Sequence, residues 1–321
     1  MGLLKYIKNH IWHDRNTRSS LDQAQHKLNR IQSVLDEMVS QNRMDYLRDK
    51  TLNSHESGIS DEKCCESELV VSLTTFGKRI YDVYLAIESI MQGSVQPNRI
   101  VLWLSEEEFK GKPLPRTLEL QKKRGLQVEY CEDIRSYKKL IPTLKLYPDS
   151  CIITIDDDVM CVFDVVERLL NSHLNHPNAV CACRMHEVKL DGNGRLKGYL
   201  DWNWDIVKCD KASSLLFPTG VGGVLYPPHC LPDEVLNEKV FMSICPYADD
   251  VWFYAMELMH GTPAVKTYTG KKYYFVDIPS YAINSLSAQN TNAANCRNDV
   301  QIKAVFDKYQ LYSKLTDASE R

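Results

Sequence analysis

Three consecutive carboxylates follow an apolar run near the middle of the chain. Residues 151–155 (CIITI) have the composition of a buried strand, and Asp156, Asp157 and Asp158 come directly after it. If the chain stays extended there, Asp156 and Asp158 point to one side and Asp157 to the other. Oxygen ligands of this kind suit Mg²⁺ or Mn²⁺, with phosphate oxygens completing the shell. An acidic turn or a helix cap explains one aspartate but not three, so the triplet predicts a metal site.

A second acidic pair, Asp249-Asp250, precedes a stretch in which apolar residues recur with helical spacing at 252, 255, 256 and 259. The pair therefore lies at a predicted helix N-terminus, where aspartate is a favoured cap and interacts well with the helix dipole. One carboxylate suffices for capping. The other is a candidate for chemistry.

Polar and basic residues near the predicted strands could bind an anion or a nucleotide. Thr74 and Thr75 offer hydroxyl groups after the strand at 69–74, and Arg79 offers a planar fork that suits phosphate. The alternative is a turn followed by an exposed basic helix start. Lys138 and Lys139 lie on a predicted helix just before the acidic strand, and the sequence does not choose between them.

Glycine and tryptophan residues supply a third group of candidates. The run 217–228 (FPTGVGGVLYPP) contains Gly222 and Gly223, whose backbones can approach a ligand closely, but it lacks the spacing of a phosphate-binding loop. A tight hairpin is the alternative. Trp202 and Trp204 could form a platform for a sugar ring or belong to the core. For Arg184, His186 and Asn298 we expect structural or capping roles.

Four of these segments, in this order, resemble bacterial polysaccharide glycosyltransferases of the family-2-like type, which have the GT-A fold. They are VVSLTTFGKRI, KKLIPTLKLYPDSCIITIDDDV, GVGGVLYPP and ADDVWF, and the resemblance covers about residues 66–315. It implies a metal-dependent inverting transfer of a sugar from a UDP- or GDP-sugar donor to a glycan or glycolipid acceptor, in capsule or lipopolysaccharide biosynthesis.

The resemblance also implies roles for individual residues. Asp156 and Asp158 match the D-x-D element that binds Mn²⁺ or Mg²⁺, and Asp250 matches the catalytic base, with Asp249 where many relatives have Glu. No histidine follows His260, so the third metal ligand that many such enzymes place there is missing. The implied donor-binding residues are Thr74, Thr75, Arg79, Lys138, Lys139, Asp156 and Asp157. Gly222, Gly223 and Trp202 would border the donor sugar and the acceptor.

Other functions remain open at this point. Within the enzymes, a retaining transferase or a sugar nucleotidyltransferase would also use an acidic metal site. A glycan-binding scaffold that has lost catalysis is an alternative from a different class.

The elements that must position these residues alternate between strand and helix. Apolar runs at 69–74, 100–104, 126–130 and 151–155 are separated by segments with helical periodicity at 81–92, 118–124 and 137–146. Strands that are apolar on both faces predict an α/β fold, a mostly parallel Rossmann-like sheet flanked by helices. In such sheets the ligand lies at the carboxyl ends of the strands.

The first 60 residues differ from the rest. A short amphipathic stretch at residues 3–12 suggests either a peripheral membrane anchor or a helix packed on the domain. Leu21, Leu28 and Leu35 then recur every seven residues, with Ala24, Ile31 and Met38 between them. This pattern predicts a short coiled coil or a helical hairpin, and the coiled coil would give self-association through residues 18–41. We therefore expect an N-terminal helical segment at 1–60, a linker at 53–62 and a GT-A domain at 66–315.

Composition limits the remaining classes. The chain has 321 residues, 44% of them hydrophobic, which is enough for a sizeable core. With 42 acidic and 39 basic residues it carries a net charge of −3, which argues against nucleic-acid binding through a basic face. No apolar run is long enough for a membrane span, no secretory signal is recognisable, and the 11 cysteines lack paired spacing. We expect a cytoplasmic protein, with contact to the inner membrane at most peripheral.

Overall fold

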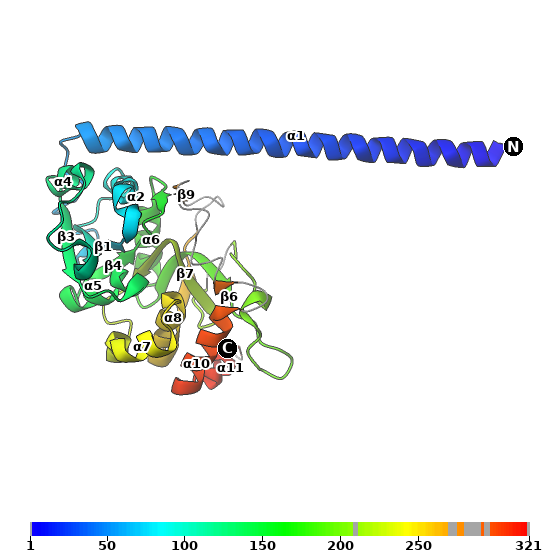
Figure 1. Ribbon diagram of the computed structural model, residues 1–321. Helices are drawn as coiled ribbons and strands as arrows, with labels where there is room; N and C mark the ends of the chain where they lie inside the picture. Colours follow the sequence, from blue (N-terminus) through cyan, green and yellow to red (C-terminus); the bar gives the residue numbers. More distant parts are fainter. Residues whose placement is uncertain (1, 208–210, 269–274, 279–289, 292–295, 320–321) are drawn as a thin grey trace. The chain divides into compact units, whose positions relative to one another are not determined.

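The computed structural model describes residues 2–207, 211–268, 275–278, 290–291 and 296–319, and within these the side chains of residues 2–22 and 316–319 are not described. The chain divides into two compact units, residues 1–46 and 47–321. Helix α1 (Gly2–Asn53) is a single continuous helix, drawn in blue in Figure 1, and its last two turns belong to the second unit.

The second unit is built on a seven-stranded, mostly parallel sheet with the order β3-β2-β1-β4-β7-β6-β8. Strands β1 to β4 are parallel to one another, β6 is parallel to β8, and β7 runs antiparallel to both β4 and β6. A separate pair joins β5 to β9. The strands are β1 (Leu69–Thr74), β2 (Arg99–Ser105), β3 (Leu126–Cys131), β4 (Cys151–Thr154), β5 (Val159–Cys161), β6 (Val180–Glu187), β7 (Leu216–Tyr226), β8 (Ala264–Lys266) and β9 (Phe275–Asp277).

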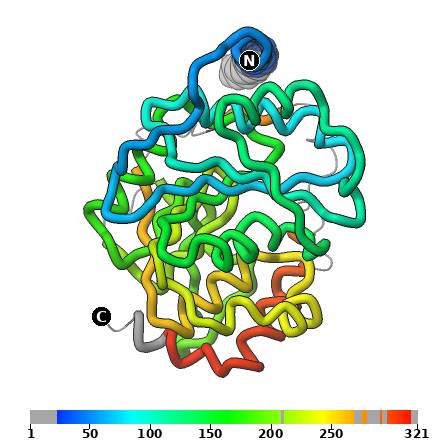
Figure 2. The backbone as a smooth tube through the Cα atoms, turned by 90° about the vertical axis from the view of Figure 1, so that its left-hand side faces the viewer, coloured from blue at the N-terminus to red at the C-terminus, as the bar shows by residue number. Residues whose placement is uncertain are grey.

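Helices cover both faces of the sheet, which confirms the predicted α/β fold class. In Figures 1 and 2, α2 lies on one side of the sheet, and α7, α8 and α10 lie on the other. The helices of this unit are α2 (Val83–Met91), α3 (Glu106–Phe109), α4 (Arg116–Lys122), α5 (Ile141–Leu146), α6 (Val165–Asn175), α7 (Glu238–Ile244), α8 (Asp249–His260), α10 (Arg297–Tyr309) and α11 (Tyr312–Ser319). Four short 3₁₀ helices join them, η1 (Gly77–Tyr81), η2 (Arg135–Lys139), η3 (Tyr199–Asp201) and η4 (Asp233–Leu236).

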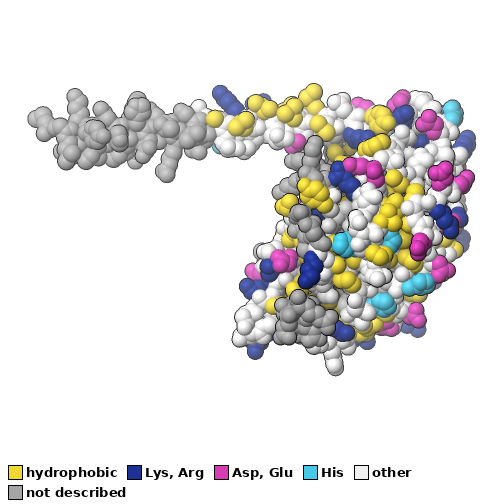
Figure 3. Space-filling view, turned by 180° about the vertical axis from the view of Figure 1, so that it is seen from behind, with side chains coloured by type: hydrophobic (Ala, Val, Ile, Leu, Met, Phe, Trp, Pro, Cys, Tyr) yellow, Lys and Arg dark blue, Asp and Glu magenta, His cyan; other side chains and the backbone are white. Residues whose placement is uncertain are grey.

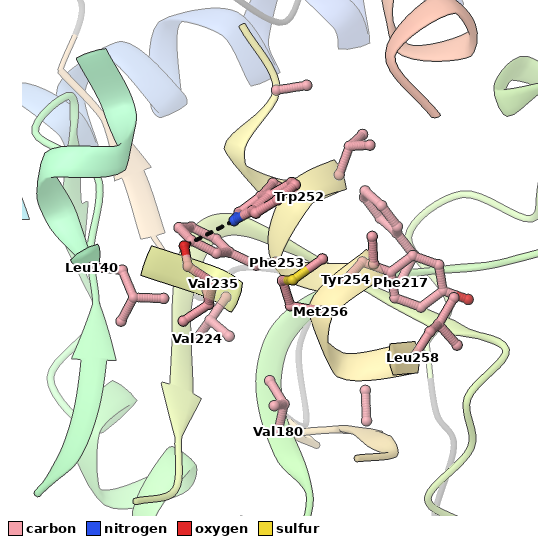
Figure 4. Close-up of a cluster of buried hydrophobic side chains, with 14 of the residues drawn as sticks. Leu140, Val180, Phe217, Val224, Val235, Trp252, Phe253, Tyr254, Met256 and Leu258 are labelled. Atoms are coloured by element: carbon pink, nitrogen blue, oxygen red, sulfur yellow. Dashed lines mark hydrogen bonds between the residues drawn. The ribbon is translucent and has the colours of Figure 1, made fainter. Parts of the chain in front are cut away.

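Helix α8 lies at the centre of the main hydrophobic core. Nine of its twelve residues are buried, so it is apolar on nearly all sides and must pack against several elements. Figure 4 shows Trp252, Phe253 and Met256 among side chains from β6 and β7. The indole N–H of Trp252 donates to the carbonyl of Val235, at 3.1 Å (dashed in Figure 4). This packing fixes the first turn of α8, where Asp249 and Asp250 lie.

The last turns of α1 are tied to the domain by a buried polar cluster around Glu88 of α2. Leu47 is fully buried, and Thr51 is 1% exposed. The Glu88 carboxylate accepts hydrogen bonds from Thr51 Oγ1 (3.1 Å), Gln121 Nε2 (3.0 Å) and Arg124 Nη1 (2.9 Å). The buried charge is therefore paired and hydrogen-bonded, as burial of a carboxylate requires.

The rest of the described α1 carries exposed apolar side chains (Figure 3). The exposed fractions are 60% for Leu28, 56% for Ile31, 50% for Leu35 and 56% for Met38, the residues of the predicted heptad seam. The stretch expected to contact a membrane has no described side chains. Within the described residues, no helix combines the length and the apolar character needed to cross a membrane.

Candidate active site

A cavity of about 680 Å³ lies at the carboxyl ends of β1 and β4, where a parallel sheet places its ligand. Its walls also come from β6, β7, η2 and the first turn of α8. Ten of the residues singled out from the sequence line it together: Thr74, Thr75, Arg79, Lys138, Lys139, Asp156, Asp157, Asp158, Asp249 and Asp250.

The acidic triplet does not continue the strand. β4 ends at Thr154, and Asp157 and Asp158 lie in a turn, so the expected alternation of side chains was wrong. Arg79 Nη1 contacts both carboxylates, at 2.6 Å from Asp157 and 3.1 Å from Asp158. Asp157 is buried and also accepts a hydrogen bond from Thr75 Oγ1 at 2.6 Å. These contacts fix Asp157 and orient Asp158, whose side chain is 31% exposed.

The charges of the triplet are only partly neutralised by the side chains around them. Burial raises the pKa of Asp158 to about 6, and repulsion from Asp156 and Asp157 adds to it while Arg79 opposes it. Burial likewise raises the pKa of Asp157, against the effect of Arg79 and Thr75. A site in which carboxylates raise one another's pKa has a deficit of positive charge, which a bound cation would remove.

Lys139 joins the triplet to helix α8. Its ammonium group lies 3.0 Å from Asp156 Oδ1 and 3.0 Å from Asp249 Oδ2, and the side chain is 8% exposed. Burial lowers the pKa of Lys139, but the neighbouring aspartates outweigh it and raise this pKa well above its ordinary value. The lysine is therefore charged. Lys138 also lines the cavity but forms its ion pair with Asp133, so the two lysines have different partners.

The first turn of α8 presents two aspartates, and neither acts as the cap. The N-cap position is Ala248, without a side-chain cap hydrogen bond. Asp249 Oδ1 instead accepts a hydrogen bond from Ser136 Oγ at 2.9 Å. Asp250 is partly exposed and is hydrogen-bonded to the backbone of Gly220. Burial raises the pKa of Asp250 to about 7, with repulsion from Asp249 and Asp156 adding to the effect and Lys139 opposing it.

The glycine-rich run is part of strand β7 and not a loop. On β6, Ala182 pairs with Val224 and Arg184 with Thr219, so the single residue between them faces residues 220–223 of β7. This bulge places Gly220 in the cavity wall. A Cβ at Gly220 would lie 2.7 Å from Lys139 Nζ and 3.3 Å from Asp156 Oδ1, so a residue without a side chain lets the ion pair approach the strand.

Three residues expected near the ligand lie outside the cavity wall. Gly223 has φ +107°, and a Cβ there would meet the side chains of Ile155 and Leu169 at 3.0 Å, so it faces the core. Gly222 does not line the cavity either. Trp202 is 4% exposed, packs against other aromatic rings and donates its indole N–H to the carbonyl of Lys197. The expectation that these three residues border the donor sugar and the acceptor was therefore wrong.

Of the two tryptophans considered as a sugar platform, Trp204 does line the cavity. The structure adds three residues for which structural or capping roles were expected: Arg184 and His186 from β6, and Asn298 from α10. Trp204 is 37% exposed and stacks on the His186 ring at 4.7 Å. The pairing of β6 with β7 brings Arg184 opposite Thr219, next to Gly220, and this long-range arrangement has no local signal in the sequence.

The side chains of the cavity can be compared with the ligands that a divalent metal ion requires. Among the described side chains there is no group of three or more His, Cys, Asp or Glu arranged to hold one. Asp156 and Asp158 both reach the cavity, and their carboxylate oxygens are of the type that Mg²⁺ and Mn²⁺ prefer. Mg²⁺ commonly takes one or two carboxylates and completes its shell with water and substrate phosphates. The residues present therefore fit a divalent cation that is shared with a phosphate ligand.

Comparisons with known proteins give a likeness of fold alone. No family model matches the chain, and no curated protein matches it. One similar solved structure is the mannosyltransferase PcManGT from Pyrobaculum calidifontis, in complex with GDP-Man and Mn²⁺, with 13% identity, coverage of 89% of this chain and 84% of that one, and a TM-score of 0.43. Another is TarS residues 1–349 from S. aureus, with 11% identity, coverage of 75% and 71%, and a TM-score of 0.40. The function must therefore be argued from this chain's own residues.

Proposed function

We propose that this chain is a metal-dependent glycosyltransferase that moves a sugar from a nucleotide-sugar donor to a glycan acceptor with inversion. The observation that carries the proposal is the pairing of Asp156, at the end of β4, and Asp249, at the start of α8, with one buried lysine in a single cavity. It supports a metal and diphosphate site at the β4 end of the cavity, with a carboxylate that would act as the base on α8. A role in bacterial surface polysaccharide synthesis follows from the sequence resemblance, and we propose it on that ground.

Asp156 and Asp158 would hold the Mn²⁺ or Mg²⁺. Such an ion, when bound, neutralises charge on the departing nucleoside diphosphate. Lys139 pairs with Asp156 and holds it in place, while Arg79 and Thr75 hold the turn that carries Asp158. Arg79 thus positions Asp157 and Asp158. To contact the donor as well, its guanidinium would have to bind these aspartates and a donor phosphate at the same time. Thr74 and Lys138 also line the cavity, and we propose them as further contacts to the nucleotide.

Asp250 is suited to the role of general base. An acceptor hydroxyl would attack the anomeric carbon as the bond from that carbon to the phosphate oxygen breaks, and the hydroxyl proton would pass to the Asp250 carboxylate. A base works best when its pKa lies near the working pH, and the pKa of Asp250 is raised to about 7. The hydrogen bond from the Gly220 backbone orients the Asp250 carboxylate.

The metal site gives the direct test of this function. We expect wild-type protein with Mn²⁺ to release free UDP or GDP slowly from a UDP- or GDP-sugar, as donor hydrolysis. Asp158→Asn should weaken Mn²⁺-dependent binding of UDP or GDP by at least about 100-fold, because even residues behind the ligands affect metal affinity by about 10- to 100-fold. Titration calorimetry with and without Mn²⁺ measures this loss.

The matched control is Asp149→Asn, which removes the same charge from a side chain that is 85% exposed. It should bind nucleotide like the wild type. If Asp158→Asn retained full metal-dependent binding, the metal site would be misplaced. If the wild type released no nucleotide and showed no metal-dependent binding, a glycan-binding scaffold would be the better description.

We also propose that α1 associates with a second copy of the chain through residues 18–41. Besides the heptad seam, Val34 (48% exposed) and Val39 (58% exposed) widen the apolar face. Residues 23–46 contain three basic residues and three acidic residues and so carry no net charge. Helices that bind anionic membranes are rich in Lys and Arg, so this balance favours a protein partner, and a heptad repeat favours an identical helix.

Leu35→Asp should abolish this association. An unpaired charge at the centre of an apolar seam costs about 3 kcal/mol or more, which corresponds to an increase of at least about 100-fold in the dissociation constant. Sedimentation equilibrium of the full chain measures the change in mass. Ser33→Asp, which places the same charge off the seam, is the control. A monomeric wild type at micromolar concentration would contradict the proposal.

A further inference from the structure

The guanidinium of one arginine in the cavity wall has no hydrogen-bond, ion-pair or ring partner in the described part of the chain. The guanidinium of Arg184, half-buried on β6, forms no hydrogen bond or ion pair with any described residue. The other cations of the wall are engaged. Arg79 and the two lysines pair with aspartates, and Arg135 donates to the Pro246 carbonyl and lies 4.2 Å from the ring centroid of Tyr247.

The charge of Arg184 acts on two neighbouring aromatic side chains, His186 and Tyr199. Both pack against Trp204: His186, two residues further along β6, stacks on it at 4.7 Å, and Tyr199 lies 5.2 Å from it. The indole N–H of Trp204 donates to the Tyr199 carbonyl, at 3.1 Å, which fixes the plane of the ring while part of it faces the cavity. Burial, together with the charge of Arg184, lowers the pKa of His186 to about 3, so the imidazole is neutral. Arg184 is then the cation of this part of the wall.

A polar atom completes the set. Asn298 is 7% exposed, lines the cavity, and has an Oδ1 atom with no hydrogen-bond partner in the described part of the chain. A buried amide oxygen without a partner costs about 1–3 kcal/mol, so a ligand that donates to it would gain affinity. Asn298 also hydrogen-bonds Tyr199, and the charge of Asp250 acts on Tyr199. The Arg184 wall is therefore within electrostatic range of the base assigned above.

We propose that Arg184, Trp204 and Asn298 form the acceptor subsite, and that the acceptor sugar carries an anionic group, a carboxylate or a phosphate. This inference rests on the proposed glycosyl transfer and adds the class of acceptor. A partly exposed indole packs against the apolar face of a sugar ring, the amide oxygen of Asn298 accepts a hydrogen bond from a hydroxyl, and the planar guanidinium binds an oxyanion with two parallel hydrogen bonds.

The donor diphosphate is a second source of oxyanions. Arg184 pairs in register with Thr219, the residue before Gly220, so the donor side of the cavity is close in the sheet. One observation favours the acceptor. The charge of Arg184 acts on His186 and Tyr199, the two rings that pack against Trp204, and Trp204 is the ring on which a sugar would lie.

The experiment compares acidic and neutral acceptors. The full chain with Mn²⁺ and the donor that it hydrolyses is offered an array of oligosaccharides in matched pairs, each acidic glycan beside its carboxyl-reduced or dephosphorylated form. We expect the wild type to transfer to acidic members preferentially. Arg184→Gln should reduce kcat/KM on acidic members by about 10- to 100-fold, the range for a lost hydrogen bond to a charged group. It should have little effect on neutral members, and Arg184→Lys, which keeps the charge without the fork, should be intermediate.

Arg116→Gln, an exposed arginine outside the cavity, is the matched control and should keep the wild-type preference. Wild-type transfer without preference for acidic members, transfer to neutral members alone or to none, or an equal loss on both members in Arg184→Gln would overturn the inference. A matching loss of UDP or GDP affinity in Arg184→Gln would assign the anion to the donor instead. Failure of the wild type to release nucleotide would count against the glycosyltransferase itself, so the two failures are distinguishable.

Discussion

Asp250→Asn is expected to slow sugar transfer by about 10²- to 10⁴-fold, the usual contribution of a general base. The amide has nearly the same size as the carboxylate but cannot take the acceptor proton. Affinity for UDP or GDP with Mn²⁺ should stay within about threefold of wild type, because the metal and donor groups come from the β4 end of the cavity. Initial rates of transfer and calorimetric titration measure the two quantities separately.

The pH profile gives an independent readout of the same residue. Asp250 must be deprotonated to act as a base, so kcat/KM should fall as the pH drops through about 7, the raised pKa of this group. In Asp250→Asn this acid limb should disappear from the residual activity. Asp307→Asn, which removes an exposed carboxylate on α10, should keep the wild-type profile. Wild-type activity in Asp250→Asn would exclude it as the base.

Lys139→Met should produce the largest loss of stability among single substitutions in the site. The methionine would fit the buried space, but Asp156 and Asp249 would lose the cation that both contact at 3.0 Å. Removal of one partner from a buried ion pair costs about 3–5 kcal/mol, because the remaining charge stays buried. For a domain of this size that is a fall in Tm on the order of 10 °C, which calorimetry can measure.

Lys138→Met provides a matched comparison. Lys138 is buried to a similar degree, but its partner Asp133 is 48% exposed and can be hydrated when the lysine is removed. We therefore expect a clearly smaller fall in Tm for Lys138→Met. Equal losses for the two variants would show that Lys139 is an ordinary buried lysine and not the link between β4 and α8.

The sequence predicted the parallel half of the sheet well. Strands β1 to β4 start and end within about two residues of the predicted runs, because buried parallel strands are apolar on both faces and stand out from the segments between them. The position of the acidic triplet followed from the same rule, since ligands gather at the carboxyl ends of such strands. The N-terminal periodicity correctly predicted helix. The two patterns described in the sequence belong to one continuous helix, α1.

The other half of the site depends on long-range pairing. For residues 217–228 the sequence predicts glycines that approach a ligand or a tight hairpin, whereas residues 216–226 form strand β7. Glycines at 220, 222 and 223 weaken the local strand signal, and the neighbouring strands β4 and β6 supply the pairing. Trp202 and Trp204 are two residues apart, and only the fold decides that one is buried and the other faces the cavity. The turn at Asp157 is held by Arg79, which is far from it in the sequence.

The hydrogen bond of Thr51 to Glu88 has a practical consequence for the shortest fragment that can be expected to fold. A fragment that starts near residue 60 would lack Leu47, which is fully buried, and would leave the Glu88 carboxylate short of one donor. Fragments meant to isolate catalysis from self-association should therefore begin before Leu47. The amino-terminal limit of the folded domain is therefore set by the hydrogen bond from Thr51 to Glu88, and not by the position of the polar stretch in the sequence.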